Sequence, residues 1–243
     1  MSAGTPQLDI AGPRATITLR RPDEHNRIDP ADPEVMLAHF AKIAADPAVR
    51  LLVITGMGSR TFSSGYTIDA IRGELDDRFE RMLDTLENLP LPVVCALNGS
   101  VYGGAIDLAL CCDFRIGVRG SRMFMPAAKF GLHYYPGGLR RYVTRLGLSA
   151  AKKLFLTAMA VDAEEMRRIG FLTELVDADK LDAEVARYAD ALVACEPEVI
   201  ASMKNFLNQI AGGNIDLPAQ RAAYAKFLAS DELAKRLAAA GKG

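Results

Sequence analysis

Three short apolar runs, rich in Val, Ile and Leu, place the strongest constraint on how this 243-residue chain can fold. They are VRLLVITGMG at 49–58, LPVVCALNG at 91–99 and FRIGV at 114–118. Continuous apolar runs of this length are typical of strands that are buried on both faces, as in parallel sheets. Stretches with helical spacing of apolar residues precede or separate them, at 32–46, 74–88 and 104–111. This alternation predicts an α/β fold.

The two ends of the chain differ in their patterns. Near the N-terminus, RATITLR at 14–20 alternates apolar and polar residues, which predicts a half-buried strand. After Ser149 the sequence is rich in Ala, poor in strand patterns and helical in its periodicity. We therefore predict an α/β core over residues 1–145 and a helical region over residues 146–243.

Charge and hydropathy exclude several classes of partner. The formal net charge is −1 and the two signs are interspersed, so we expect neither nucleic acid nor an anionic membrane as a partner. The opening MSAGTPQLDIAGP lacks the basic and apolar regions of a secretion signal. The longest apolar run, 89–112, is interrupted by two prolines, Asn98, Asp107 and a glycine pair, which argues against a membrane span.

The cysteines point to a reducing compartment rather than to a metal site. The chain has four of them: Cys95, Cys111, Cys112 and Cys195. Their spacing contains no CxxC and matches no common set of metal ligands. We predict reduced, buried cysteines in a cytoplasmic protein, and no metal site.

The stretch NGSVYGGAIDLALCCD, residues 98–113, joins a small-residue turn to an apolar helix. A helix that begins at Gly104 presents unpaired amides there, and these favour an anion. Asp107 lies three residues further on and therefore shares a helix face with Gly104. Two interpretations remain open for Asp107: a catalytic carboxylate, or a structural one that caps the helix or forms an ion pair.

Five segments, in this order, resemble the crotonase (enoyl-CoA hydratase/isomerase) superfamily. They are ITLRRPDEHNRI, DPAVRLLVITGMGSRTFSSGYTI, LPLPVVCALNGSVYGGAIDLALCCDFRIG, FMPAAKFGLHYYPGGLRRYVTRLG and AKKLFLTAMAVDAEEMRRIGFLTELV. The resemblance covers nearly the whole chain. It implies a spiral of ββα units, a helical C-terminal trimerisation region, and acyl-CoA thioester substrates. It implies no cofactor beyond the coenzyme A of the substrate.

The same resemblance assigns roles to residues in two loops. The reactions of this superfamily pass through a thioester enolate, whose oxygen needs two backbone N–H donors. The resemblance gives these donors to Tyr66, in FSSGYT, and to Gly104. It places Asp107 where hydratases of the family keep their first catalytic glutamate. Its RPxxxN turn implies coenzyme A contacts by His25, Asn26, Arg27 and Ile28, with Arg27 as the phosphate partner.

One position departs from the hydratase pattern. Where those enzymes carry a second glutamate after proline, this chain has Ala127, which cannot transfer a proton. The following loop offers His133, Tyr134 and Tyr135. Tyr134 matches the active-site tyrosine of methylmalonyl-CoA decarboxylase, a member of the same superfamily, and His133 is a candidate catalytic group. Because neighbouring residues in an extended chain point in opposite directions, we expect at most one of the two tyrosines to face the ligand.

The sequence thus predicts an acyl-CoA enzyme that stabilises a thioester enolate during hydration or isomerisation of a C=C bond, with a non-standard acid/base set. A decarboxylase of the methylmalonyl-CoA type is the first alternative. A non-catalytic acyl-CoA-binding homologue is the second. The resemblance further implies a homotrimer or a dimer of trimers.

Overall fold

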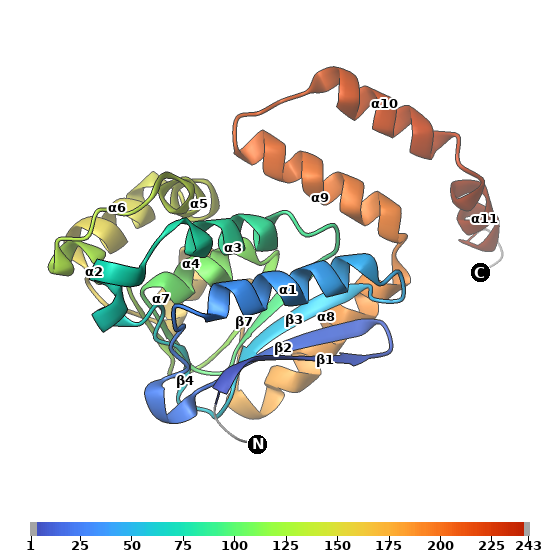
Figure 1. Ribbon diagram of the computed structural model, residues 1–243. Coiled ribbons are helices and arrows are strands. Elements are labelled where there is room, and N and C mark those ends of the chain that lie inside the picture. The colour runs from blue at the N-terminus through green and yellow to red at the C-terminus, as the bar shows by residue number, and fades with distance from the viewer. Residues whose placement is uncertain (1–3, 241–243) are drawn as a thin grey trace.

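The computed structural model of the protein describes residues 4–240 and contains two β-sheets with helices packed around them (Figure 1). In spatial order, the larger sheet contains β1 (Gly4–Ala11), β2 (Arg14–Arg20), β3 (Leu51–Gly56), β5 (Val93–Leu97), β7 (Phe114–Val118) and β10 (Glu174–Val176). The smaller sheet contains β4 (Thr61–Ser63), β6 (Ser100–Tyr102), β8 (Arg122–Phe124) and β9 (Val161–Asp162). Neighbouring strands are parallel except in the pairs β1–β2 and β8–β9.

Eleven α-helices connect and cover these strands within the described residues. They are α1 (Asp32–Ala45), α2 (Ile71–Glu74), α3 (Asp77–Glu87), α4 (Gly104–Cys111), α5 (Pro136–Leu146), α6 (Leu148–Thr157), α7 (Ala163–Arg168), α8 (Leu181–Ala194), α9 (Pro197–Ala211), α10 (Leu217–Leu228) and α11 (Asp231–Ala240). Short 3-10 turns occur at Pro22–Glu24, Ile68–Ala70, Ala127–Phe130 and Ala178–Lys180. Between residues 4 and 240, no helix combines the length and apolar character needed to cross a membrane.

The chain advances as a spiral in which each turn gives one strand to each sheet. β3 joins the larger sheet and β4 the smaller one before α2 and α3, and β5 and β6 do the same before α4. β7 and β8 form the next turn. The predicted spiral of ββα units is therefore confirmed. In the smaller sheet, strands from successive turns of the spiral lie side by side.

The central strands are apolar throughout because both of their faces are covered. On β3, Leu52 and Ile54 face the core beneath α1, α3 and α4, whereas Leu51 and Val53 face α8. β2 was predicted to be half-buried, and every second residue along it, including Ile17, is buried. The continuous runs thus mark strands between two helical layers, as predicted.

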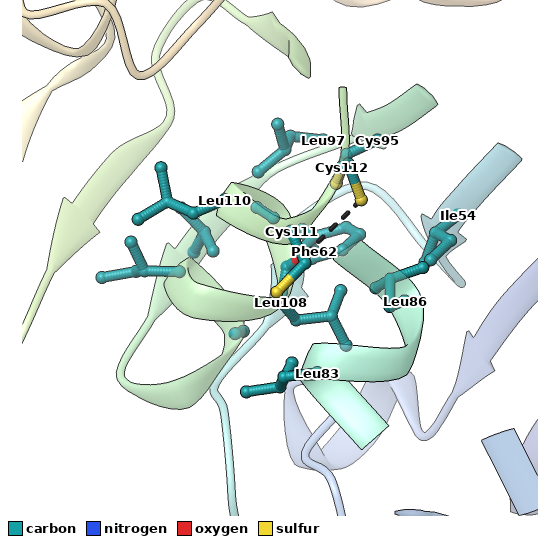
Figure 2. Close-up of a cluster of buried hydrophobic side chains, with 14 of the residues drawn as sticks. Ile54, Phe62, Leu83, Leu86, Cys95, Leu97, Leu108, Leu110, Cys111 and Cys112 are labelled. Atoms are coloured by element: carbon teal, nitrogen blue, oxygen red, sulfur yellow. Dashed lines mark hydrogen bonds between the residues drawn. The ribbon is translucent and has the colours of Figure 1, made fainter. Parts of the chain in front are cut away.

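A compact core lies between α3, α4 and the strands, and it contains three of the four cysteines (Figure 2). Cys95, Cys111 and Cys112 are fully buried beside leucines such as Leu86, and the thiol of Cys112 donates to the Leu108 carbonyl at 3.4 Å. The prediction that all four cysteines are buried was wrong for the fourth. Cys195 follows the last turn of α8 and is exposed.

Between residues 146 and 240 the chain is mostly helical and contains two short strands, β9 and β10. β9 belongs to the smaller sheet and β10 to the larger sheet, and α8 packs on the larger sheet. α9 is anchored to the core by Lys204, whose Nζ lies 2.8 Å from Asp113 and donates to the Leu91 carbonyl at 2.9 Å. α10 and α11 extend away from the sheets (Figure 1).

Candidate active site

A cavity of about 380 Å³ opens where successive turns of the spiral meet. Its walls come from the loop after β4, the start of α4, helices α2 and α3, and the segment that follows β8. The lining residues are Ser64, Tyr66, Ile68, Ile71, Leu75, Asp76, Asp77, Phe79, Glu80, Gly103, Gly104, Met125, Pro126, Ala127, Phe130, Leu132, His133, Tyr134 and Tyr135. Both loops singled out in the sequence therefore meet at one cavity.

The loop after β4 approaches the start of α4 so closely that only glycine fits there. Gly65 has a φ of +84°, and a Cβ on it would lie 2.6 Å from the Gly104 nitrogen. A Cβ on Gly104 would lie 2.9 Å from the Phe79 ring and 3.6 Å from the Tyr66 nitrogen. The parallel pairing of β4 with β6 produces this approach, because both loops leave the same edge of the smaller sheet. It brings the Tyr66 and Gly104 amides to the cavity wall.

These two amides are free to bind an anion. Within residues 4–240, neither the Tyr66 N–H nor the Gly104 N–H donates to a protein acceptor. Gly104 is the first residue of α4, so its N–H has no carbonyl within the helix to pair with. Two unpaired N–H groups on a cavity wall, one at a helix N-terminus, can stabilise a developing oxyanion.

The turn at residues 25–28 holds the first of these loops in place. The Ser64 N–H donates to the His25 carbonyl at 2.8 Å, and the Ile28 N–H donates to the Gly65 carbonyl at 2.8 Å. The buried amide of Asn26 bonds to the carbonyls of Met57 and Thr61, each at 2.9 Å. The turn thus fixes the backbone that presents the Tyr66 amide.

The four residues of this turn, for which coenzyme A contacts were predicted, lie outside the cavity lining. His25 bonds to Thr61 through Nδ1 at 2.9 Å, and Ile28 is part of the core. Arg27 is partly exposed and pairs with Asp29 at 2.8 Å and with Glu24 at 3.3 Å. Their contact with coenzyme A stays a prediction.

Asp107 lies behind the cavity wall. Its side chain is 0% exposed, and its Oδ1 accepts from Arg141 Nε at 2.7 Å. Its Oδ2 accepts from the Tyr135 hydroxyl and, at 3.4 Å, from Arg141 Nη2. Burial raises the pKa of Asp107 above the usual range of a carboxyl, although the adjacent Arg141 opposes this shift. The ion pair that the sequence left open as one interpretation is present, and its partner Arg141 was not predicted.

Arg141 is itself the centre of a partly buried charge network between α3, α4 and α5. Its Nη1 lies 2.7 Å from Asp84 and 3.1 Å from Glu87. Glu87 also pairs with Arg140 and, at 3.2 Å, with Arg145. The network satisfies the donors of Arg141 and fixes it beneath the site.

Tyr134 and Tyr135 both line the cavity, contrary to the expectation that only one would. Their rings stack, with centroids 4.6 Å apart and planes inclined by 26°. A Cβ on Gly138 would collide with the Tyr134 ring, so the absence of a side chain at Gly138 makes room for this pair. The Tyr134 hydroxyl is buried and has no hydrogen-bond partner among the described residues. The Tyr135 hydroxyl is the one bonded to Asp107.

Ala127 and His133 line the same cavity. Ala127 is 4% exposed, so its methyl group is part of the cavity wall. His133 is exposed, and its Nδ1 lies 2.8 Å from the Tyr134 carbonyl oxygen. The loop residues predicted from the sequence are thus brought together, whereas Tyr135 was not among the predicted catalytic residues.

Comparisons with known proteins agree with this arrangement. The chain is 33% identical over 159 residues to a crotonyl-CoA hydratase from Syntrophomonas wolfei, and the match covers 61% of this chain and 60% of the relative. It is 32% identical over 200 residues to a carnitinyl-CoA dehydratase from Salmonella typhi, covering 79% and 76%. The crystal structure of an enoyl-CoA hydratase/carnithine racemase from Magnetospirillum magneticum superposes with a TM-score of 0.87 at 26% identity, covering 98% and 92%.

The profile of the family described as Enoyl-CoA hydratase/isomerase matches residues 12–235, which is nearly the whole chain. The similarity of fold to solved structures covers 98% of this chain. The chain therefore belongs to the enoyl-CoA hydratase/isomerase family, and its fold is that of the crotonase superfamily.

Proposed function

We propose that the cavity binds an acyl-CoA thioester with its carbonyl oxygen between the Tyr66 and Gly104 amides. The observation that carries this proposal is the convergence of two unpaired N–H groups on one cavity wall. Removal of a proton next to the carbonyl, or addition to a conjugated double bond, moves negative charge onto this oxygen. Fixed donors that await the charge stabilise the enolate more than the neutral thioester, which lowers the barrier.

The reaction we propose is addition to, or migration of, a C=C bond in an enoyl-CoA. The names of the relatives, a crotonyl-CoA hydratase and a carnitinyl-CoA dehydratase, support this class. So does the charge of the cavity. Among its described lining residues, Asp76, Asp77 and Glu80 are acidic, and none is lysine or arginine. Such a wall repels a thioester whose acyl group carries a free carboxylate.

A screen of enoyl-CoA thioesters of increasing chain length tests the reaction. Hydration removes the absorbance of the conjugated thioester, and double-bond migration changes it. Turnover of at least one enoyl-CoA, lost when Gly65 is replaced by Ala, is the expected result. Thermal stabilisation by acyl-CoA without turnover of any thioester would instead identify a non-catalytic binding protein.

Decarboxylation of a malonyl-type thioester is the second candidate. It is favoured by the absence of an acid at Ala127 and by Tyr134 in the cavity wall. Loss of carbon dioxide leaves the enolate directly, so this reaction needs the two amides but no base at carbon. Release of carbon dioxide from methylmalonyl-CoA, with enoyl-CoA thioesters unchanged, would select it over hydration.

The proposal also includes an oligomeric state and a cellular location. Large apolar side chains are exposed on α6, α9, α10 and α11, among them Leu156, Met203, Leu207, Leu217, Tyr224, Leu228 and Leu237. We infer that further copies of the chain cover these helices in a trimer or a pair of trimers, in the cytoplasm. Light scattering at micromolar concentration tests the assembly, and a monomer mass would contradict it.

A further inference from the structure

The carboxylate at the start of α4 has no direct path to the cavity. Asp107 is fully buried, and both of its oxygens are occupied by donors from the segment 135–141. The donor on Oδ2 is the hydroxyl of Tyr135, which is itself a cavity-lining residue. Tyr135 therefore stands between Asp107 and any substrate.

We propose that Tyr135 and Asp107 act together as the base of this site, with Tyr135 as the catalytic residue and Asp107 as the positioning residue behind it. The Tyr135 oxygen takes a proton from the carbon next to the thioester carbonyl while the phenolic proton passes to Asp107. The C–H electron pair becomes the enolate, whose oxygen rests on the Tyr66 and Gly104 amides. The reverse transfers return the proton to carbon. This inference rests on the proposed function.

The direction of the hydrogen bond suits this transfer. Because the phenolic hydrogen points at Asp107, the lone pairs of the Tyr135 oxygen are left to accept a proton from the other side. A tyrosine that donated into the cavity instead would need to rotate its hydroxyl before it could act as a base. The resting geometry is thus already that of a proton acceptor.

The helix places this oxygen near the reacting carbon. Gly104 and Asp107 are neighbours on one face of α4, and side chains at this spacing are about 5–6 Å apart. The Tyr135 hydroxyl, which bonds to Asp107, therefore lies on the side of α4 that carries Gly104, and both residues line the cavity. The α-carbon of the thioester is bonded directly to the carbonyl carbon held at that amide. The Phe79 ring packs edge-on against both neighbours, with its centroid 5.4 Å from that of Tyr66 and 6.4 Å from that of Tyr135.

The charges around the pair support the division of roles. Burial and the adjacent Asp107 raise the pKa of Tyr135, so the phenol is neutral at pH 7 and its proton must have an acceptor when it takes another. Burial also raises the pKa of Asp107, which makes it a better proton acceptor than an exposed carboxylate. Arg141, 2.7 Å away, keeps the carboxylate in place.

Exchange of α-protons in butyryl-CoA tests the inference, because it requires one base and the two amides but no second acid. The protein is incubated with butyryl-CoA in deuterium oxide, and loss of the α-proton signal is followed by NMR. We expect exchange by the unmodified protein and a decrease of about 10²–10⁴-fold in Tyr135→Phe and in Asp107→Asn. The double variant should lose no more than either single one, since both act in one step. Binding of butyryl-CoA should change less than about threefold.

Tyr188→Phe is the matched control, since it removes a phenolic oxygen that bonds to Glu174 far from the cavity. Tyr135→Phe alone carries the test if Asp107→Asn does not fold. Exchange by Tyr135→Phe at the rate of the unmodified protein would overturn the inference and leave the proposed function intact. An unmodified protein that neither exchanges α-protons nor turns over any thioester would overturn the proposed function as well.

Discussion

The carboxylate of Asp107 and the guanidinium of Arg141 form an ion pair in which neither side chain is exposed, with Nε 2.7 Å from Oδ1. Taking two charges out of water costs several kcal/mol each, which close pairing and further hydrogen bonds must offset. Arg141 obtains these bonds from Asp84 and Glu87, and Asp107 obtains one from Tyr135. The pair is therefore one part of a network that joins α3, α4 and α5 behind the cavity.

Arg141→Met should destabilise the protein by about 3–5 kcal/mol, because it leaves Asp107 buried without a compensating charge. Urea unfolding followed by circular dichroism measures this loss. Arg81→Met is the control, since its ion pair with Glu34 is about half exposed and should contribute less than about 1 kcal/mol. Equal stability of the two variants would show that the Asp107–Arg141 pair contributes no more than a surface pair.

Gly65→Ala should abolish the anion site while leaving the rest of the fold in place. The new methyl group would lie 2.6 Å from the Gly104 nitrogen, at a φ of +84° that alanine rarely adopts, so the two loops must separate. We expect turnover of the preferred enoyl-CoA to fall by about 10²–10³-fold, as when an oxyanion donor is lost.

Gly73→Ala provides the matched control for that experiment. Gly73 lies on α2, where an added Cβ meets no atom within 4 Å. Its rate should remain that of the unmodified protein. If Gly65→Ala were equally active, the Tyr66 and Gly104 amides could not be the anion site.

Ala127→Glu should add a second proton-transfer group to the cavity wall. Because Ala127 lines the cavity, the new carboxylate enters the substrate space, and hydration of a short enoyl-CoA should rise by at most about 10²-fold. Ala128→Glu, at the exposed neighbouring position, should have no effect. An Ala127→Glu variant with unchanged hydration and unchanged acyl-CoA binding would mean that this position does not face the thioester.

Glu87 should make stability depend on pH in the acid range. Burial acts to raise its pKa, but pairing with Arg140, Arg141 and Arg145 outweighs burial and lowers the pKa below its ordinary value. A carboxyl with a lowered pKa stabilises the fold above its unfolded pKa, about 4.3, and this stabilisation is lost as the pH falls further. The Tm difference between the unmodified protein and Glu87→Gln should therefore be largest near pH 6 and shrink below pH 4. A difference independent of pH would contradict the assignment.

The parts of the fold that could be predicted were those in which local pattern and packing agree. The helix at 104–111 and the strand at 114–118 were predicted to the residue, because each apolar run ends where a turn begins. β1 was not predicted, since only one of its eight residues is buried and its sequence shows no clear alternation. The strands of the smaller sheet have only two or three residues each, which is too short for a periodic signal.

The backbone donors of the candidate site could be predicted from the sequence, but the ion pair behind them could not. Gly104 and Tyr66 were assigned from the resemblance of two short loop sequences, FSSGYT and YGGA, to the family. The environment of Asp107 depends on Arg141, which comes from another helix and whose approach no local pattern encodes. Tyr134 and Tyr135 also escape the alternation rule, because their rings stack against each other rather than pointing to opposite sides.

The two amides of the anion site lie on loops that only the pairing of β4 with β6 brings together. Neither loop can hold an oxyanion by itself, so a proteolytic fragment that ends before β6 should be inert even if its own helices form. During refolding, recovery of turnover should lag behind recovery of helical signal, because a non-local parallel contact forms more slowly than a local helix. The recovery of turnover therefore measures when strands of successive turns of the spiral pair during refolding.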